Sequence, residues 1–404
     1  MSEAKIERGS EEAMVDRENT KGLEHEEEEA AEDEEEESDE ALKHEAEVIA
    51  KRVAGEIHGQ ETVIAVNFLA RGGYNSVWLA TCHGPTSLEP NRFVVRISSY
   101  NTPSLHPYQV RNEVASLPWV AANVTHIPVP KLYSWGDGTT GSGTAFTAVE
   151  YIEGQRLSVA WPRLTEEQKA CICRQIANMV ADLGETRFTS IGSLTPGTTP
   201  TPTLGPTVEA AKVFNGRTKI HSPACYDIGP YKNSRDYILA CYDREIYFHT
   251  HADPEDIEDL FEDSNIDDFI DLLKRRRQEL EDGGLDIFRQ IDGEPIVLVH
   301  EDFHAGNMLI RDGKIVGVLD WEFSGVYPLS QLLLPAQILQ ISMPLSDRND
   351  QTELEEDQWD ERFRRMVGEI VKERGWAEKD VQTLLSGGHV ELRVARKIMF
   401  PRPE

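Results

Sequence analysis

Short runs with alternating apolar and polar positions begin at residue 62 and continue to residue 98. They read TVIAVNFL from Thr62, SVWLAT from Ser76 and FVVRIS from Phe93. A period of two is the spacing of a half-buried β-strand, and the Gly72-Gly73 pair between the first two runs is typical of a turn. This pattern predicts three successive antiparallel strands.

A helix and two more strands are predicted next. Over residues 108–120, Val110, Val114 and Leu117 share one helical face, with Glu113 on or near the other. Strand-like runs then cover 131–134 and 145–152. The pattern therefore predicts a five-stranded sheet with one inserted helix, preceded by a short amphipathic helix over 42–53.

From residue 165 the apolar positions take helical spacing. Thr165 and Gln168 form a capping-box pair, followed by a run of apolar residues that repeats every three to four positions. Further helices are predicted over 231–248, 267–280 and 359–371. The second part of the chain is therefore expected to be mainly helical.

Two short apolar runs in this helical part, 297–299 and 315–319, predict buried strands with polar residues at their ends. His300, Asp302 and Asn307 follow the first run. Asp320 and Glu322 close the second. A candidate base beside several hard oxygen ligands suits Mg²⁺ and a nucleoside triphosphate, so this patch predicts a phosphoryl-transfer site.

Composition divides the chain in two. Residues 1–50 hold 21 Asp and Glu against 5 Lys and Arg, a net charge of −16, so the remaining 354 residues carry −15 of the total −31. The segment over 1–40 is predicted to be a disordered acidic tail, because it has too little apolar surface to offset its ordering entropy. Two interpretations stay open: a functionally neutral solvated tail, and a tail that docks on a basic protein or screens the substrate cleft. Nucleic acid is not expected as a partner, because no basic face is evident.

The five cysteines predict no disulfide framework. They are odd in number and contain no C-x-x-C pair, which favours a reducing environment. The chain shows neither a signal-peptide pattern nor an uninterrupted apolar stretch of membrane-spanning length. We therefore expect a cytoplasmic protein without a membrane segment.

The order of these elements, together with the segment HEDFHAGN and the later DWE, resembles the aminoglycoside phosphotransferase family of protein-kinase-like enzymes. The family's H-x-D-x-x-x-x-N loop is matched by His300, Asp302 and Asn307, and its D-x-D or D-x-E metal element by Asp320 and Glu322. The resemblance runs from about residue 60 to about residue 330. It implies an α+β, bilobal protein-kinase-like fold with a small β-rich N-lobe over 41–152 and a larger, mainly helical C-lobe over 153–404.

The resemblance also implies roles for the residues of the patch. Asp302 would orient the acceptor hydroxyl and take its proton, and His300 would brace the loop. Asn307 and Asp320 would bind Mg²⁺, with Glu322 as a second-metal or supporting residue. ATP and Mg²⁺ are the cofactors that this arrangement implies.

The nucleotide-binding residues follow from the same resemblance. The turn formed by Gly72, Gly73, Tyr74, Asn75 and Ser76 would lie over the phosphates, although it departs from the protein-kinase pattern G-x-G-x-x-G.

Farther along the chain, Arg96 stands where the family usually has Lys, and Glu113 would be its ion-pair partner. Arg can still grip a phosphate, but it sits differently from an ammonium. Glu150 and Ile152 match the segment that joins the lobes, where backbone groups would pair with adenine.

Two features stay open. His249, His251 and Asp253 form an H-x-H-x-D string that could indicate a metal site, but it follows a helical segment and has no further ligand set. The many carboxylates between Asp253 and Asp282 fit either a solvated helix face or an anionic pocket for a cationic acceptor, such as an amino sugar or a choline-like amine.

The sequence thus predicts an ATP- and Mg²⁺-dependent phosphotransferase that acts on the hydroxyl of a small molecule. The alternative is a catalytically impaired, kinase-like nucleotide-binding or interaction protein.

Overall fold

The computed structural model describes residues 40–57, 63–72, 75–83, 91–98, 106–139, 143–197, 202–209, 212, 216–257, 265–283, 285–333 and 350–397. The acidic tail predicted over 1–40 lies outside these residues except at Glu40. The described residues form two compact units. The first contains those up to Gly72 together with Ser76–Ile97, and the second contains Asn75 and those from Ser98 onward.

The first unit contains a helix over residues 40–57 and the strands β1 (Val63–Arg71), β2 (Asn75–Cys82) and β3 (Asn91–Ser98). β1 and β2 pair antiparallel, with Arg71 opposite Ser76 beside the turn. Buried residues alternate with half-buried ones along most of β2 and β3, as the period of two requires. The three strands and the leading helix predicted for this segment are confirmed.

The second unit begins with α2 (His106–Asn123), β4 (Leu132–Asp137) and β5 (Ala145–Glu150). β4 and β5 pair antiparallel, and α2 packs against both β4 and β7 (Ser193–Thr195). Because α2 is covered on two sides, Asn112 and Glu113 are buried together with Val114. The expectation that Glu113 lies on a polar face was wrong.

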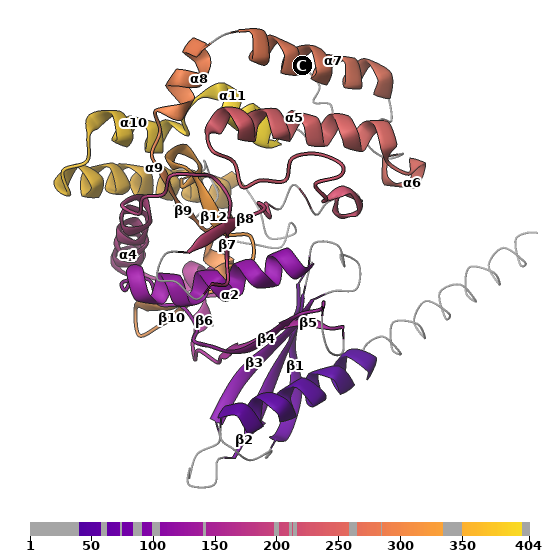
Figure 1. Ribbon diagram of the computed structural model, residues 1–404. Helices are drawn as coiled ribbons and strands as arrows, with labels where there is room; N and C mark the ends of the chain where they lie inside the picture. Colours follow the sequence, from indigo (N-terminus) through magenta and orange to yellow (C-terminus); the bar gives the residue numbers. More distant parts are fainter. Residues whose placement is uncertain are drawn as a thin grey trace, which may run out of the picture. The chain divides into compact units, whose positions relative to one another are not determined.

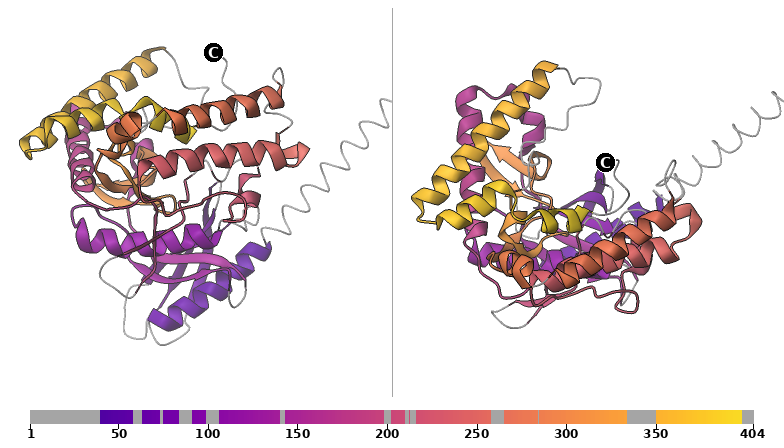
Figure 2. Two further views of the ribbon diagram at one scale, coloured as in Figure 1. Left: turned by 45° about the horizontal axis from the view of Figure 1, so that its top comes forward. Right: turned by 90° about the horizontal axis from the view of Figure 1, so that it is seen from above.

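Long helices form most of the rest of this unit. α4 (Glu166–Gly184) starts at the predicted capping box, in which Thr165 and Gln168 satisfy each other's backbone N–H groups. α4 packs against α9 (Asp350–Glu373), and α5 (Ser234–His251) lies beside α7 (Ile266–Asp282) (Figures 1 and 2).

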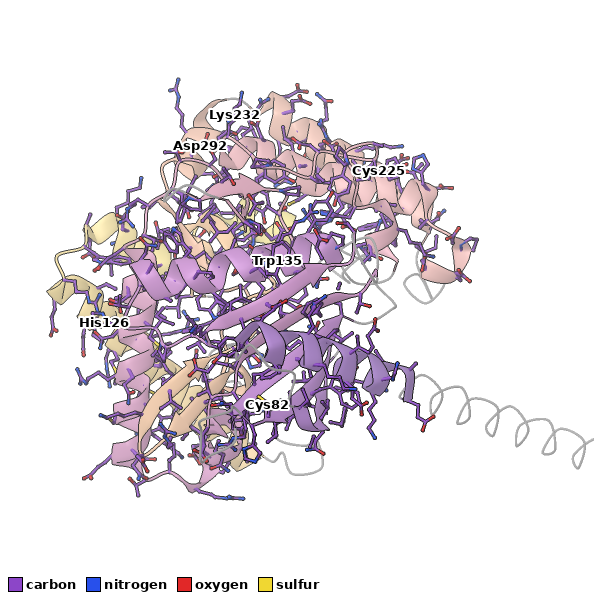
Figure 3. The ribbon with its side chains drawn as sticks, turned by 60° about the horizontal axis from the view of Figure 1, so that its bottom comes forward. Cys82, His126, Trp135, Cys225, Lys232 and Asp292 are labelled. Carbon is purple, nitrogen blue, oxygen red and sulfur yellow. The ribbon has the colours of Figure 1, made fainter. Side chains whose placement is uncertain are left out.

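α5 starts later than the apolar pattern indicated. The Asn233 side chain caps the helix by accepting a hydrogen bond from the Asp236 N–H, and the preceding Tyr231 instead pairs with Ile191 in a β-bridge. Asp292, at the end of α8 (Leu285–Asp292), accepts a hydrogen bond of 2.8 Å from the Ser234 N–H. Figure 3 labels Asp292 and Lys232 at this junction.

Short strands build the frame of the candidate site. β9 (Ile296–Val299) pairs with β12 (Gly325–Pro328), and β10 (Met308–Arg311) forms a hairpin with β11 (Lys314–Val318). β10 was not predicted, since only its continuation into β11 carries a clear apolar run. β10 also pairs with β6 (Gln155–Arg156), which follows β5 directly in the chain.

The remaining elements of the described residues are short. They are β8 (Thr203–Gly205), α3 (Leu157–Ala160), α6 (Pro254–Ile257), α10 (Glu378–Ser386), α11 (Val390–Lys397) and the 3-10 turns Trp161–Arg163, Arg217–Ile220, Ala305–Asn307 and Leu329–Gln331. β8 pairs with β7, and α11 packs on α5.

A β-rich N-terminal part and a mainly helical C-terminal part make this an α+β fold, as expected. All five cysteines are free thiols: Cys82 on β2 and Cys225 before α5 are labelled in Figure 3. Within the described residues, no helix has both the length and the apolar character needed to cross a bilayer.

Candidate active site

The predicted patch assembles where β9 ends and where β11 runs into β12. The loop after β9 holds His300, Asp302 and Asn307, and the chain after β11 holds Asp320. Two hydrogen bonds join the segments directly: the Leu319 N–H donates to the Asn307 carbonyl at 2.8 Å, and His300 Nε2 contacts the Leu319 carbonyl at 2.9 Å. These bonds hold the loop after β9 against the segment after β11, although the bonded residues lie more than ten positions apart in the chain.

His300 braces this loop from inside. Its side chain is fully buried, and burial lowers its pKa from 6.5 to about 4, so the ring is neutral near pH 7. Nδ1 accepts a hydrogen bond of 3.3 Å from the Asp302 N–H, which leaves Nε2 to donate to the Leu319 carbonyl. The geometry fits the bracing role expected for His300.

Asp302 is the most exposed acid of the loop, with 43% of its side chain accessible. His304 Nε2 lies 3.3 Å from Oδ1, and Asn307 Nδ2 donates to Oδ2 at 2.7 Å. Partial burial alone would raise the pKa of Asp302, but the hydrogen bonds and charges of His304, His300 and Asn307 outweigh it and hold that pKa below its usual value. The carboxylate is therefore ionised, oriented and reachable.

His304 contacts the Asp302 carboxylate, and the sequence reasoning missed it. Its Nδ1 accepts a hydrogen bond of 3.0 Å from the Gly306 N–H, so the proton sits on Nε2 and points at Asp302. Gly306 makes room for the ring, because a Cβ at that position would lie 2.6 Å from His304 Cε1. The His-Ala-Gly sequence between Asp302 and Asn307 was the available signal.

Asn307 and Asp320 have the donor chemistry of a magnesium site. Asn307 uses Nδ2 for its hydrogen bonds to Asp302, which directs the amide oxygen away from that carboxylate. Asp320 is half-buried in a left-handed backbone conformation, with φ +67°. No cluster of three or more His, Cys, Asp and Glu is placed to hold a metal within the described residues. Mg²⁺ bound with a nucleotide needs few protein ligands, because phosphates and water supply the rest.

Glu322 is placed differently from Asp320. Its side chain is buried, and both carboxylate oxygens lie within hydrogen-bond distance of Asn75 Nδ2, at 3.0 and 2.9 Å. Asn75 is the last residue of the glycine-containing turn and the first of β2. Two residues predicted to contact different groups, one the nucleotide and one the metal, thus contact each other.

Asn112 on α2 holds the backbone after Asp320 and was also missed. This fully buried amide donates to the carbonyls of Glu322 and Ser324, at 3.0 and 2.5 Å, and accepts from the Leu194 N–H at 3.0 Å. Its position next to Glu113, on a helix expected to have a polar face, hid it from the sequence reasoning.

Glu301 precedes Asp302 and adopts an unusual conformation for a residue with a side chain, with φ +68°. Both of its carboxylate oxygens lie 2.9 Å from Arg396 Nη2 on α11. Burial raises the pKa of Glu301, although Arg396 opposes that shift. The pair connects α11 to the loop after β9.

The predicted nucleotide-binding residues are distributed over both units. Gly73 and Tyr74 lie outside the described residues, and the structure places Gly72, Ser76 and Arg96 in the first unit. Glu113, in the second unit, accepts a hydrogen bond of 3.0 Å from Thr147 Oγ1. Glu150, which is exposed, and the half-buried Ile152 lie at and just after the end of β5.

A cavity of about 650 Å³ opens beside this joining segment. Its lining includes Tyr151, Glu153 and the Arg311–Gly313 turn of the β10–β11 hairpin, but neither Asp302 nor Asp320. Volume alone therefore does not locate the reacting groups.

Two of the acids after residue 252 pair with a lysine. Asp253 and Asp256 bind Lys219 Nζ at 3.0 and 2.7 Å, and the acids at the start of α7 include the exposed Asp268. Glu258, Asp259, Glu262 and Asp263 lie outside the described residues. His249 and His251 lie in the last turns of α5, and each ring bonds the carbonyl four residues earlier.

Comparison with protein families identifies the chain. The model of the phosphotransferase enzyme family matches residues 66–365. The protein belongs to this family. Family membership and the observed architecture together confirm the kinase-like fold and the resemblance drawn from the H-x-D-x-x-x-x-N loop.

Two curated relatives are subtelomeric hrmA-associated cluster proteins from two strains of Aspergillus fumigatus. Each is 30% identical to this chain over 129 residues, which is 31% of this chain and 24% of the relative. The similarity thus spans about a quarter of those proteins' length.

Solved structures that are similar to this chain include aminoglycoside phosphotransferases. The ternary complex of APH(2")-IIa with streptomycin and ATP is 14% identical, with a TM-score of 0.43 over 84% of this chain and 93% of that one. APH(4)-Ia in its apo form is 16% identical, with a TM-score of 0.40 over 86% of this chain and 99% of that one. Identities at this level say nothing about the acceptor.

Proposed function

We propose that this phosphotransferase uses ATP and Mg²⁺ to phosphorylate a hydroxyl group of a small molecule. The observation that carries the proposal is Asp302, which is ionised, 43% accessible and held on both oxygens by His304 and Asn307. A hydroxyl is a weak nucleophile at neutral pH, and a fixed carboxylate within reach both orients it and accepts its proton.

In the proposed reaction, the acceptor oxygen attacks the γ-phosphorus of ATP. The hydroxyl proton moves to Asp302, the bond from the γ-phosphorus to the bridging oxygen breaks, and ADP leaves with that electron pair. His304 keeps the Asp302 carboxylate aimed at the acceptor, while His300 holds the loop backbone.

Asn307 and Asp320 would hold Mg²⁺ through the amide oxygen and the carboxylate. The bound ion would neutralise charge on the triphosphate. The proposed phosphate contacts are the turn over residues 72–76 and Arg96, with Glu113 as the expected partner of Arg96. The proposed adenine contacts come from the segment of Glu150 and Ile152. Because Arg96 stands in place of Lys, the phosphate would be bound by a planar guanidinium group rather than by a compact ammonium group.

For the acceptor, we propose a cationic small molecule such as an amino sugar or a choline-like amine, because the helical part around residues 253–282 is rich in carboxylates. The direct test is ATP consumption by the full chain across amines, neutral sugars and aminoglycosides, with Mg²⁺ and with a chelator. We expect turnover only with Mg²⁺ and only with hydroxyl-bearing cations. Preference for neutral sugars would reject the cationic class while leaving the phosphotransferase assignment intact.

A second candidate is a nucleotide-binding protein that has lost efficient transfer, and Arg96 is the observation that favours it. ATP binding by calorimetry without turnover on any acceptor would support this alternative. The acidic tail would then be its docking segment for a basic partner, as the charge of residues 1–40 suggests.

A further inference from the structure

Glu322 stands in the position of the second acid of the metal element, but its surroundings differ from those of a metal ligand. The side chain is 5% exposed, and its two oxygens share the Asn75 amide at 3.0 and 2.9 Å. A carboxylate that must bind a cation entering from solvent is better placed at an open edge, as Asp320 is with its half-buried side chain.

The backbone of Glu322 is fixed independently of its side chain. Asn112 donates to the carbonyl of Glu322 at 3.0 Å and to that of Ser324 at 2.5 Å. The fully buried Trp321 beside it donates from Nε1 to the Val318 carbonyl at 3.0 Å. Because these contacts anchor the segment, the Glu322 side chain provides a fixed acceptor for whatever group approaches it.

The approaching group is the residue at the junction of the glycine-containing turn and β2. Asn75 is 9% exposed, and its Nδ2 faces the carboxylate across 247 positions of the chain. A hydrogen bond to a buried charged acceptor is stronger than one between neutral groups. The contact therefore fixes the end of the turn, at Asn75, relative to the segment that follows Asp320.

We propose that Asn75 and Glu322 form a positioning pair that couples Asn75, at the start of β2, to the metal-binding segment, with Glu322 acting through Asn75 rather than as a metal ligand. The proposal rests on the proposed function, since it assigns these residues a part in placing the triphosphate beside Asp320. Both are positioning residues, because neither needs to touch a reacting atom.

The proposed pair can be tested by exchanging the amide and the carboxylate between positions 75 and 322. Asn75→Asp places two carboxylates against each other in a buried site and should lower the midpoint of thermal unfolding by roughly 5 °C. Glu322→Gln alone keeps an amide oxygen that Asn75 can reach, so its effect should be small. In the double variant, the new amide at position 322 can donate to the new carboxylate at position 75. This restores the hydrogen bond with its direction reversed, so most of the loss should be recovered.

The experiment compares these three variants and the wild type as full chains, first by thermal unfolding without any ligand and then by calorimetric titration of ATP at several Mg²⁺ concentrations. Asn67→Asp, the same chemical change at an exposed position on β1, is the matched control and should leave both measurements near wild type. We expect Asn75→Asp to weaken ATP binding about tenfold. Glu322→Gln should keep the Mg²⁺ dependence of ATP binding within about twofold of wild type.

Two results would contradict the proposed positioning pair. One is a double variant no more stable than Asn75→Asp, and the other is a Glu322→Gln protein whose Mg²⁺ requirement rises tenfold or more, as expected for a lost metal ligand. If the wild-type protein binds no ATP, the proposed function fails, and the ligand-free unfolding comparison still decides whether the pair exists.

Discussion

The ion cluster at the centre of α5 and the loop after β9 both hold a carboxylate between donor groups, yet they differ in access to solvent. Glu245 is completely buried, with Arg217 Nη2 at 2.8 Å and Arg244 Nε at 2.6 Å. Asp302 has a similar number of donors but keeps 43% of its side chain exposed. The α5 cluster can only stabilise the packing of the helical part, whereas Asp302 can meet a substrate.

The comparison separates charge used for folding from charge used for chemistry. In the α5 cluster, enclosure makes each partner depend on the others, since a lone buried ion is costly. In the loop, His304 and Asn307 each contact one oxygen of the carboxylate and leave its side chain 43% accessible. An oriented, accessible acid is thus a better indicator of a site than a concentration of charge.

The largest expected effect comes from breaking the enclosed cluster. Glu245→Ala leaves two buried guanidinium groups without their carboxylate and should lower the free energy of unfolding by about 3–5 kcal/mol. Chemical denaturation measures this loss. The control is Lys219→Ala, which removes an exposed lysine from its acidic partners and should change stability far less. Equal effects of the two variants would show that enclosure does not matter here.

Two buried histidines, His300 in the loop and His221 directly after the Arg217–Ile220 turn, predict a loss of stability in acid. Burial lowers the pKa of His300 to about 4 and that of His221 to about 3, both below the ordinary value of 6.5. At pH values between each folded-state pKa and 6.5, the unfolded chain binds more protons than the folded chain. The stability that these histidines contribute is therefore fully present above pH 6.5 and is lost as the pH falls toward 4. The shifts correspond to contributions on the order of 3 kcal/mol for His300 and 5 kcal/mol for His221.

Unfolding free energies measured at several pH values in this range test the effect. Replacing His221 with Asn removes one titrating group far from the loop and should flatten the slope. An unchanged slope would mean that His221 is not held neutral by the fold.

The smallest expected effect concerns the orientation of Asp302. In Gly306→Ala the new Cβ would meet the His304 ring at 2.6 Å and displace it from the carboxylate. We expect kcat to fall roughly tenfold while the unfolding midpoint stays near wild type. Gly197→Ala, where the nearest atom is 3.7 Å away, is the matched control. A kcat within twofold of wild type would remove His304 from the positioning of the base.

Much of the fold follows from local patterns. The period of two predicted β1, β2 and β3, and the capping box placed the start of α4 correctly, because these signals depend on neighbouring residues alone. Burial of α2 on two sides was not predictable, since it depends on β7, a three-residue strand about 70 positions later. β10 was missed because four residues carry too little periodicity.

In the candidate site too, local spacing was predictable and long-range contacts were not. The spacing of His300, Asp302 and Asn307 identified the loop, and the two segments do meet through Leu319. The contacts of Asn75 with Glu322 and of Glu301 with Arg396 join residues 247 and 95 positions apart, and single-sequence patterns carry no information about such pairs. The roles of the individual site residues stay predictions.

The central claim is that Asp302 is the base of a phosphotransferase. It is tested most directly by comparing wild type and Asp302→Asn for ATP consumption with the best acceptor and for ATP binding by calorimetry. Asn keeps the shape of the side chain but cannot accept the proton, so turnover should fall about 10³-fold while the dissociation constant of ATP stays within a few-fold. Wild-type turnover in this variant would contradict the account.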